Sequence, residues 1–324
     1  MGKSKKNAKL IHKVSTERVR EEWFKILSSK RTFETLLLMQ KSGLLEQVIP
    51  QLTVMERVHQ GGYHHLDVWR HSLEVVHQFE ELLKELSFPR KRESRTLVSS
   101  GSPINPPKSV ADGDDNKFIQ DYLQAEIAAG HKRYALLKFA CLVHDIGKPD
   151  TKKKEAGRMT FHGHEHVGAR MVRIIAHQMK LSVKERHFLE DLTTWHLRPG
   201  YLSNFKKPSQ RMIFRFLRDT KEEALSVLFL SLADQRSTRG PLTTKAKLQH
   251  HQKICQDVIK RFIQQKDQKP LVRLITGYDL IKKLKLKPSP LFAKVLSGVG
   301  EAQSLGKIST KKEALVLARK IAKV

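Results

Sequence analysis

Two histidines and two aspartates stand where the surrounding pattern predicts the interior of the protein. Each adjoins an apolar stretch: His71 lies within 67–86, His144 and Asp145 follow 136–143, and Asp234 follows 225–233. Burying such groups is unfavourable unless they are paired or bind a metal. A single buried histidine is more often a hydrogen-bonded core residue than a ligand. Two imidazoles together with two carboxylates, however, suit a divalent cation.

Helical patterning accounts for the elements that must position these residues. Apolar residues recur every three or four positions, with Ser15 as a cap and Gly43 as a stop. The predicted helices begin at Ser15 and then cover 33–39, 67–86, 136–143, 167–179, 185–195, 209–217 and 222–233. Convincing strand alternation is absent, so the sequence predicts an all-α fold.

The charge of the chain is strongly positive and unevenly distributed. Across 324 residues, 61 Lys and Arg against 33 Asp and Glu give a net charge of +28. Residues 242–324 carry 19 Lys and Arg against 5 Asp and Glu, a net charge of +14. Such a field favours a polyanionic partner, either nucleic acid or an anionic membrane surface. Because no apolar face rich in Trp or Phe accompanies the charge, the membrane is the weaker reading.

Hydropathy and cysteine usage indicate a location. No run of residues has the length and apolar character of a membrane span, and no apolar run follows the basic N-terminus as in a signal peptide. The two cysteines, Cys141 and Cys255, lack any CxxC spacing. A reducing, cytoplasmic location is the simplest expectation.

One internal segment differs in composition from the rest. Residues 87–117 hold four of the twelve prolines, many serines and the run Pro-Arg-Lys-Arg. Such a segment cannot bury enough apolar surface to offset the cost of chain ordering. We therefore expect a disordered insertion over about 87–117.

Several segments in order carry a resemblance to the HD phosphohydrolase superfamily. His71, the run His144-Asp-Ile-Gly-Lys148 and Asp234 follow its H…HD…D pattern. Residues 63–71, 161–169, 196–199 and 232–241 resemble the HD domain of bacterial tRNA nucleotidyltransferases and poly(A) polymerases. The resemblance implies an HD-domain helical bundle over 57–241, with N-terminal neck-like helices over 1–56 and a basic helical tail over 242–324. This sequence carries nothing like the mixed α/β catalytic head of those enzymes.

The resemblance also implies a metal centre. In the family pattern His71, His144, Asp145 and Asp234 bind a first divalent metal, and His164 and His196 match positions that supply a second, with Asp145 as a bridge. We expect His164 near the start of helix 167–179, where the positive helix end keeps the imidazole neutral. A solvated turn over 162–166 is the alternative. The ligand types admit Mn, Ni, Co, Mg, Fe or Zn.

The chemistry implied by such a centre is hydrolysis of a phosphoester, with Asp145 and Lys148 as catalytic residues. Lys148 could bind a phosphate as a point charge, and Arg198 could hold a second oxygen. Arg236 and Arg239 could face RNA or substrate, or form surface ion pairs. The substrates implied are 2′,3′-cyclic nucleotides, 2′-nucleotides or the phosphorylated end of an RNA.

The tail favours contact with the phosphate backbone of a structured, tRNA-like RNA. The run that contains Lys282, Lys283, Lys285 and Lys287 could form an amphipathic RNA-binding surface, or simply a solvated face. A rival hypothesis is a non-catalytic RNA-binding body that works with a separate nucleotidyltransferase subunit.

Overall fold

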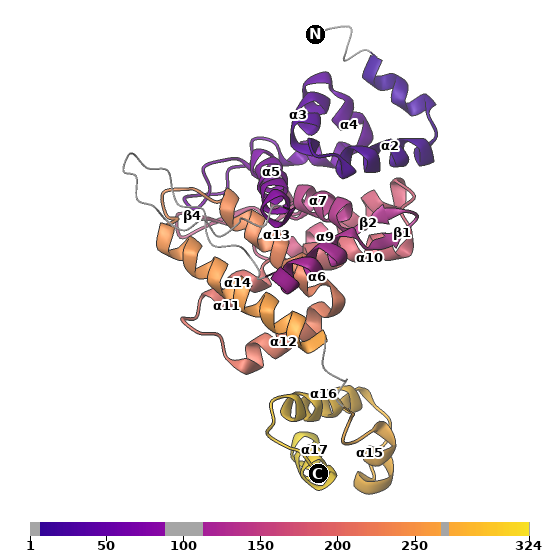
Figure 1. Cartoon of the computed structure of the whole chain (residues 1–324), viewed down its shortest axis with the longest axis vertical. Coiled ribbons are helices and arrows are strands. Elements are labelled where there is room, and N and C mark those ends of the chain that lie inside the picture. The colour runs from indigo at the N-terminus through magenta and orange to yellow at the C-terminus, as the bar shows by residue number, and fades with distance from the viewer. Residues whose placement is uncertain (1–6, 88–112, 267–271, 324) are drawn as a thin grey trace. The chain divides into compact units, whose positions relative to one another are not determined.

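The computed structural model describes residues 7–87, 113–266 and 272–323, which divide into two compact units. The first unit comprises Met1–Asn204 and Glu222–Ile263, and the second comprises Phe205–Lys221 and Gln264–Val324. Both are built from helices (Figure 1), so the predicted all-α fold is confirmed. None of the helices in the described part of the chain combines the length and apolar character needed to cross a bilayer.

The first unit holds most of the helices. In chain order its elements are η1 (Lys9–Lys13), α2 (Thr16–Ser28), α3 (Thr32–Ser42), α4 (Leu44–Val48), η2 (Pro50–Met55), α5 (Val68–Ser87), α6 (Gly113–Gln124), β1 (Glu126–Ala128), β2 (His131–Lys132), α7 (Arg133–Val143), α8 (Lys148–Thr151), β3 (Lys153–Glu155), β4 (Arg158–Thr160), α9 (His164–Gln178), α10 (Val183–Trp195), α11 (Arg198–Ser203), α13 (Ala224–Ser237) and most of α14 (Lys245–Lys266). A short 3-10 turn, η3 (Lys221–Glu223), precedes α13.

Two helices that are apolar on nearly every face form the centre of this unit. Ten of the eleven residues of α7 are buried, and so is every residue of α13 from Ala224 to Ala233. Helix α13 packs against α5 and α7, while α10 packs against α7, α9 and α13 (Figure 1). The helix ends match the sequence signals: the Ser15 hydroxyl accepts from the Arg18 N–H, and Gly43 ends α3 in the left-handed conformation with φ 73°.

Two small hairpins interrupt the helices, and the sequence did not predict them. Strand β1 pairs with β2, and β3 pairs with β4 in antiparallel register. Their turns place Ala129-Gly130 and Ala156-Gly157 at positive φ, as a two-residue hairpin connection requires. Strands of two or three residues are too short to show an alternating pattern, which is why the sequence gave no signal.

The predicted insertion falls largely outside the described residues, which omit 88–112. Its last residues, 113–117, are nevertheless helical because α6 begins at Gly113. Burial of Ile119 and Leu123 and a hydrogen bond from Gln120 Nε2 to the Leu86 carbonyl tie α6 to the unit. The helix therefore starts earlier than the sequence composition suggested.

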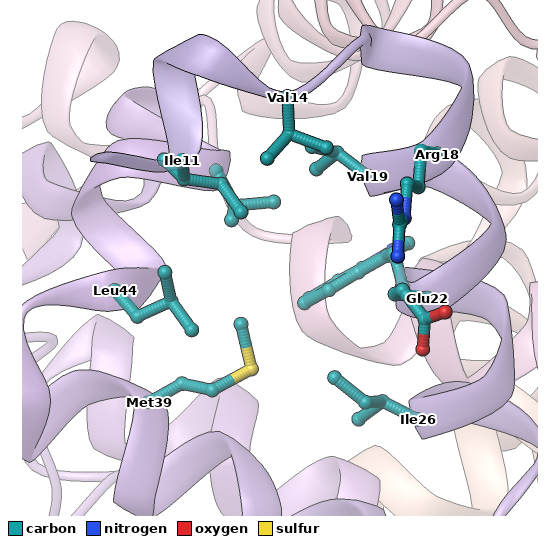
Figure 2. Close-up of a pocket in the computed structure, with 10 residues that line it drawn as sticks. Ile11, Val14, Arg18, Val19, Glu22, Ile26, Met39 and Leu44 are labelled. Carbon is teal, nitrogen blue, oxygen red and sulfur yellow. The ribbon is translucent and has the colours of Figure 1, made fainter. Parts of the chain in front are cut away.

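An apolar pocket of about 390 Å³ lies among the N-terminal helices of the first unit (Figure 2). Ile11, Val14, Met39 and Leu44 point into it, with Arg18 and Glu22 as charged residues in its lining. Glu22 is the one carboxylate among the residues that line it, and none of them is a histidine.

The second unit has a small core of its own. Its helices are α12 (Gln210–Thr220), α15 (Gly277–Leu284), α16 (Pro290–Ser304) and α17 (Lys311–Ala322). The residues buried in this core are Ile275, Leu280, Leu284, Val295, Val299, Ala314 and Ala318, and Ile213 and Phe216 on α12 are buried as well. Glu301 on α16 accepts from both Arg211 and Arg215 on α12, so charge pairing also holds this unit together.

Candidate metal centre

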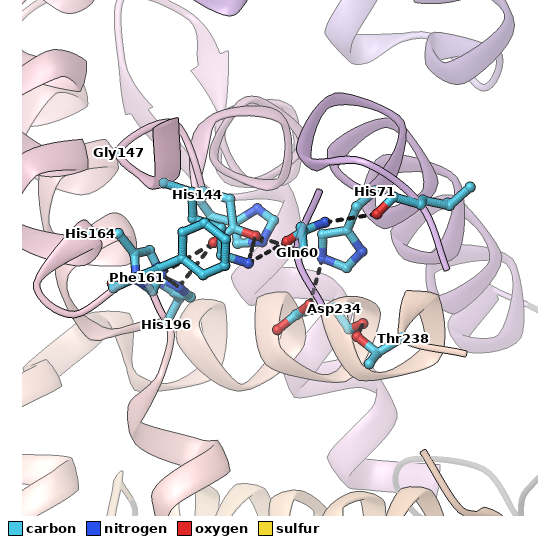
Figure 3. A network of polar contacts seen from close by, with 12 residues as sticks. Gln60, His71, His144, Gly147, Phe161, His164, His196, Asp234 and Thr238 are labelled. Atoms are coloured by element: carbon cyan, nitrogen blue, oxygen red, sulfur yellow. Dashed lines mark hydrogen bonds and ion pairs between the residues drawn. The ribbon is translucent and has the colours of Figure 1, made fainter. Parts of the chain in front are cut away.

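Helix ends in the first unit bring the predicted histidines and aspartates together (Figure 3). His71 lies on α5, His144 and Asp145 directly follow α7, His164 begins α9, His196 directly follows α10, and Asp234 lies on α13, which continues to Ser237. All but Asp234 are buried, and its side chain is 22% exposed. Five helices therefore contribute to one buried polar cluster.

The ligand atoms fall into two groups, and Asp145, a member of one, also lies close to the other. His71, His144 and Asp234 form one group, and Asp145, His164 and His196 form the other, each with its atoms within 4.8 Å of one another. Asp145 Oδ2 lies 3.1 Å from His144 Nε2 and 3.8 Å from His71 Nε2. Asp145 Oδ1 lies 3.2 Å from His164 Nε2 and 3.7 Å from His196 Nε2. One carboxylate thus directs an oxygen toward each group.

Backbone carbonyls orient three of the imidazoles in the same way. The Nδ1 atoms of His144, His164 and His196 lie 2.9, 2.8 and 2.7 Å from carbonyl oxygens three residues earlier in the chain. A carbonyl can only accept, so Nδ1 carries the hydrogen and, in a neutral ring, Nε2 keeps its lone pair. The three lone pairs therefore face the cluster, which is the arrangement that metal-binding histidines adopt.

Electrostatics in the cluster favour a positive charge. Burial alone would raise the pKa of Asp234, but the hydrogen bond and charge of His71, at 2.9 Å, hold it below its usual range. Burial would likewise raise the pKa of Asp145, and the charges of His144 and Lys148 keep it low. Burial disfavours protonation of His144, yet the charge of Asp145 outweighs it and raises the pKa of His144. Two ionised carboxylates in an enclosed site therefore attract a cation.

The pKa of His196 shifts in the opposite direction from that of His144. Complete burial, reinforced by the charges of His144 and His164, lowers the pKa of His196 to about 3. Its imidazole is therefore neutral at physiological pH and available as a ligand.

Close backbone packing holds Asp145 and His164 of one group together. A Cβ on Gly147 would lie 2.3 Å from the His164 carbonyl oxygen and 2.5 Å from the Gly168 nitrogen. Only glycine allows the turn after Asp145 to lie against the first turn of α9. The contact places His164 beside Asp145.

Lys148 contributes a positively charged side chain to the cluster. Its Nζ lies 2.6 Å from Asp145 Oδ2 and donates to Gln60 Oε1 at 2.6 Å. The Phe161 ring lies over it, with its centroid 5.7 Å from Nζ. The side chain is 10% exposed, so it lies at the inner wall of the site and not on the surface.

Three neighbours of the cluster were missed by the sequence reasoning: Gln60, His64 and Phe161. The His64 ring meets the His71 ring edge-on with centroids 4.6 Å apart, and burial beside Lys148 lowers the pKa of His64 to about 3. His64 and Phe161 lie inside the segments that carried the family resemblance, so a signal existed. Gln60 had none, because an isolated amide in a loop has no distinguishing pattern.

The predicted phosphate- or RNA-binding arginines lie outside this cluster. Arg236 forms a two-bond ion pair with Glu85 at 2.8 and 3.1 Å. Arg239 lies 3.9 Å from Glu74, and the Arg198 guanidinium lies 5.2 Å from the centre of the Trp195 ring. Arg236 thus takes the ion-pair alternative that the sequence had left open.

The predicted tail lysines belong to the second unit. Lys282 and Lys283 lie on α15, while Lys285 ends that helix in the left-handed conformation and Lys287 follows it. All four are exposed, whereas Leu280 and Leu284 on the same helix are buried. The run is therefore amphipathic, with its cations facing solvent.

The residues present fit a divalent metal. His144 Nε2 is buried and makes no well-aligned hydrogen bond among the described residues, although Asp145 Oδ2 lies 3.1 Å away. A buried nitrogen without a partner is costly unless something binds it. Imidazole nitrogens with carboxylate oxygens form a ligand set typical of divalent transition metals.

Comparison with known proteins identifies two family matches. Residues 119–239 match the family described as HD domain. Residues 3–55 match the family described as "Probable RNA and SrmB-binding site of polymerase A", which covers the segment expected to form the neck.

Known relatives extend the similarity over most of the chain. An A-adding tRNA nucleotidyltransferase from Deinococcus radiodurans is 27% identical over 301 residues, covering 92% of this chain and 56% of the relative. A CC-adding tRNA nucleotidyltransferase from Thermus thermophilus is 27% identical over 304 residues, covering 92% of this chain and 55% of the relative. A CC-adding enzyme from Synechocystis is 50% identical over 50 residues, 15% of this chain and 12% of the relative. The chain thus spans about half the length of the first two relatives.

Proposed function

We propose that this chain is a metal-dependent phosphohydrolase that acts on nucleotide or RNA phosphoesters. It carries an HD domain and is similar over most of its length to tRNA nucleotidyltransferases. One observation carries the proposal: Asp145 belongs to the group with His164 and His196 and directs its second oxygen toward His144 and His71 of the other group. If the cluster had only a structural role, each of its polar groups would need just one hydrogen-bond partner. Five other ligand residues around the Asp145 carboxylate favour one or two divalent metals.

The proposed ligands divide between two positions. His71, His144, Asp145 and Asp234 would hold the first metal, and His164 and His196 would hold a second with Asp145 as the shared ligand. A divalent metal there would supply a water nucleophile at neutral pH and offset charge on the phosphoryl oxygens. The identity of the metal stays open among Mn, Ni, Co, Mg, Fe and Zn.

The chain's own residues would position the phosphate. Lys148 Nζ, fixed between Asp145 and Gln60, would bind a non-bridging phosphoryl oxygen as a point charge. In the reaction a water oxygen forms a bond to phosphorus, one ester P–O bond breaks, and the leaving alkoxide gains a proton. With a 2′,3′-cyclic phosphate this opens the ring to a phosphomonoester.

RNA is the partner that the rest of the chain favours. The N-terminal match is described as an RNA-binding site, and the proposed tail surface exposes Lys282, Lys283, Lys285 and Lys287. We therefore include a tRNA-like RNA as partner, with contacts mainly to the phosphate backbone. A cytoplasmic location and the absence of a membrane partner stay predictions.

A second candidate is a non-catalytic RNA-binding body that works with a separate nucleotidyltransferase subunit. It is favoured by the 92% coverage of this chain by enzymes whose names describe nucleotide addition to tRNA. It predicts RNA binding without hydrolysis.

Hydrolysis assays on matched variants separate the two candidates. Wild type, Asp145→Asn and the control Asp150→Asn, which changes an exposed residue of α8, are offered 2′,3′-cyclic and 2′-phosphorylated nucleotides with Mn, Ni, Co and Mg. We expect turnover by wild type and Asp150→Asn and none by Asp145→Asn. Equal activity of all three, or no turnover with any metal, would contradict the hydrolase proposal.

A further inference from the structure

The hairpin formed by β3 and β4 presents a concentrated positive charge. Lys152, Lys153, Lys154 and Arg158 lie within seven consecutive residues that are all exposed, with Glu155 as the one acid among them. Lys153 pairs with Thr160 and Glu155 with Arg158, so these residues share one face, whereas Lys154 and Met159 share the other. The charge is therefore displayed on both faces of the hairpin.

These cations lack the partners that other cations in the first unit have. Within the described residues, none of the four makes an ion pair, and Glu155 lies instead 3.7 Å from His162 Nε2. By contrast, Arg236 pairs with Glu85, Arg173 with Glu190 and Lys180 with Glu17. Four neighbouring unpaired cations repel one another, and a polyanion would relieve that repulsion.

The hairpin joins the two sides of the metal centre. It follows α8, which begins with Lys148, and it precedes Phe161 and then His164, the first residue of α9. Its other neighbour is the loop after Gln60, because a Cβ on Gly61 would lie 3.8 Å from Met159 Cβ. Both ends of the charged hairpin are thus anchored beside the residue that we expect to bind phosphate.

The neighbouring loop offers a surface for a base. Tyr63 is 53% exposed, and Lys247 Nζ lies 5.5 Å from the centre of its ring. The loop is held in place by a hydrogen bond from the Gly240 N–H to the Tyr63 carbonyl at 2.8 Å. Exposed aromatic rings beside cations are typical of sites that bind single-stranded nucleic acid.

We propose that the hairpin residues Lys152, Lys153, Lys154 and Arg158 bind the backbone of a single-stranded RNA whose phosphorylated end occupies the metal centre. The inference rests on the proposed hydrolase function and narrows its substrate class to an RNA end. The phosphate of a mononucleotide would contact Lys148 alone, and no further phosphate would be present to bind the hairpin residues. Each added nucleotide brings one more phosphate within reach of an unpaired cation.

The test measures how hydrolysis depends on substrate length. Oligoribonucleotides of increasing length, from a mononucleotide upward and all ending in a 2′,3′-cyclic phosphate, are compared at low salt. The test variant carries Lys152→Gln, Lys153→Gln, Lys154→Gln and Arg158→Gln. A matched control removes the same charge from exposed positions on other elements, with Lys117→Gln, Lys132→Gln, Lys184→Gln and Lys253→Gln.

For wild type and the control we expect kcat/KM to rise with length by roughly tenfold or more at low salt, and the rise to shrink as salt increases. The hairpin variant should keep the mononucleotide value and lose the rise. A hairpin variant that keeps the rise, or that loses mononucleotide activity to the same degree, would overturn the inference and leave the hydrolase proposal standing. No hydrolysis by wild type at any length would overturn both.

Discussion

The metal centre of the first unit and the lysine surface of the second place charge in opposite surroundings. Asp145, His144 and His196 are buried, and each has polar neighbours within 4 Å. The four lysines Lys282, Lys283, Lys285 and Lys287 are exposed, on α15 and directly after it, whereas Leu280 and Leu284 of that helix are buried. A buried charge needs every partner in position, whereas an exposed charge does not. Substitutions should therefore have large, residue-specific effects in the first region and small, additive ones in the second.

A second buried site of the first unit, the ion pair between Lys138 and Glu80, should show the largest effect. Lys138 Nζ lies 2.8 Å from Glu80 Oε1 and also donates to Thr32 Oγ1 and the Ser29 carbonyl. Lys138→Ala leaves Glu80 buried without its cation, which should cost about 3–5 kcal/mol of unfolding free energy. Denaturant unfolding measures this value.

Lys132→Ala, at an exposed position of β2 directly before α7, is the control and should change the stability by less than about 1 kcal/mol. A small loss in Lys138→Ala would show that buried and exposed charges do not differ as proposed.

Lys148 should contribute to turnover more than to folding. Lys148→Ala removes the point charge beside Asp145, and we expect kcat to fall on the order of 100-fold while bound metal is retained. Steady-state kinetics and metal content are measured on the same preparations, with Lys184→Ala as an exposed control. An unchanged kcat would remove Lys148 from the catalytic site.

Acid sensitivity should arise from a buried histidine of the first unit. Burial lowers the pKa of His251 in the folded protein from 6.5 to about 4, although the charge of Asp234 opposes this, so the unfolded chain binds the extra proton first. The contribution to stability is full above about pH 6.5 and is lost as the pH falls toward 4. From about pH 7 to pH 5 this loss should lower the free energy of unfolding by about 2 kcal/mol.

The comparison is with His251→Asn, which cannot titrate in that range. Thermal unfolding of both proteins across the pH series should show a steeper loss for wild type. Parallel pH profiles would mean that His251 is not the group responsible.

The lysine surface should show the smallest effect on folding. Replacing Lys282, Lys283, Lys285 and Lys287 by Gln should leave the unfolding free energy and mononucleotide hydrolysis unchanged. The slope of log binding constant against log salt for a tRNA should become shallower by up to about three. An unchanged salt slope would assign RNA binding to other cations.

The sequence predicted most of the fold because helical periodicity is a local property. The caps at Ser15 and Gly43 and the apolar helix 225–233 were identified from neighbouring residues alone, and the structure confirms them. The two hairpins were missed because strands of two or three residues carry no period. Sequence periodicity therefore predicted the long helices well and the short strands poorly.

The site was predictable to the extent that its residues lie in recognisable segments. His71, His144, Asp145 and Asp234 were selected from burial patterns and the family resemblance, and the structure brings them together. Gln60 and the pairing of Arg236 with Glu85 depend on contacts between segments distant in the chain. A single sequence contains no local sign of such contacts.

The central claim is that the histidine–aspartate cluster holds a divalent metal, and metal content tests it most directly. Wild type, Asp145→Asn and Asp150→Asn are loaded with each candidate metal in turn, dialysed and analysed by elemental mass spectrometry. The account predicts one or two equivalents in wild type and Asp150→Asn and a loss in Asp145→Asn. Wild type that retains no metal under any of these conditions would contradict it.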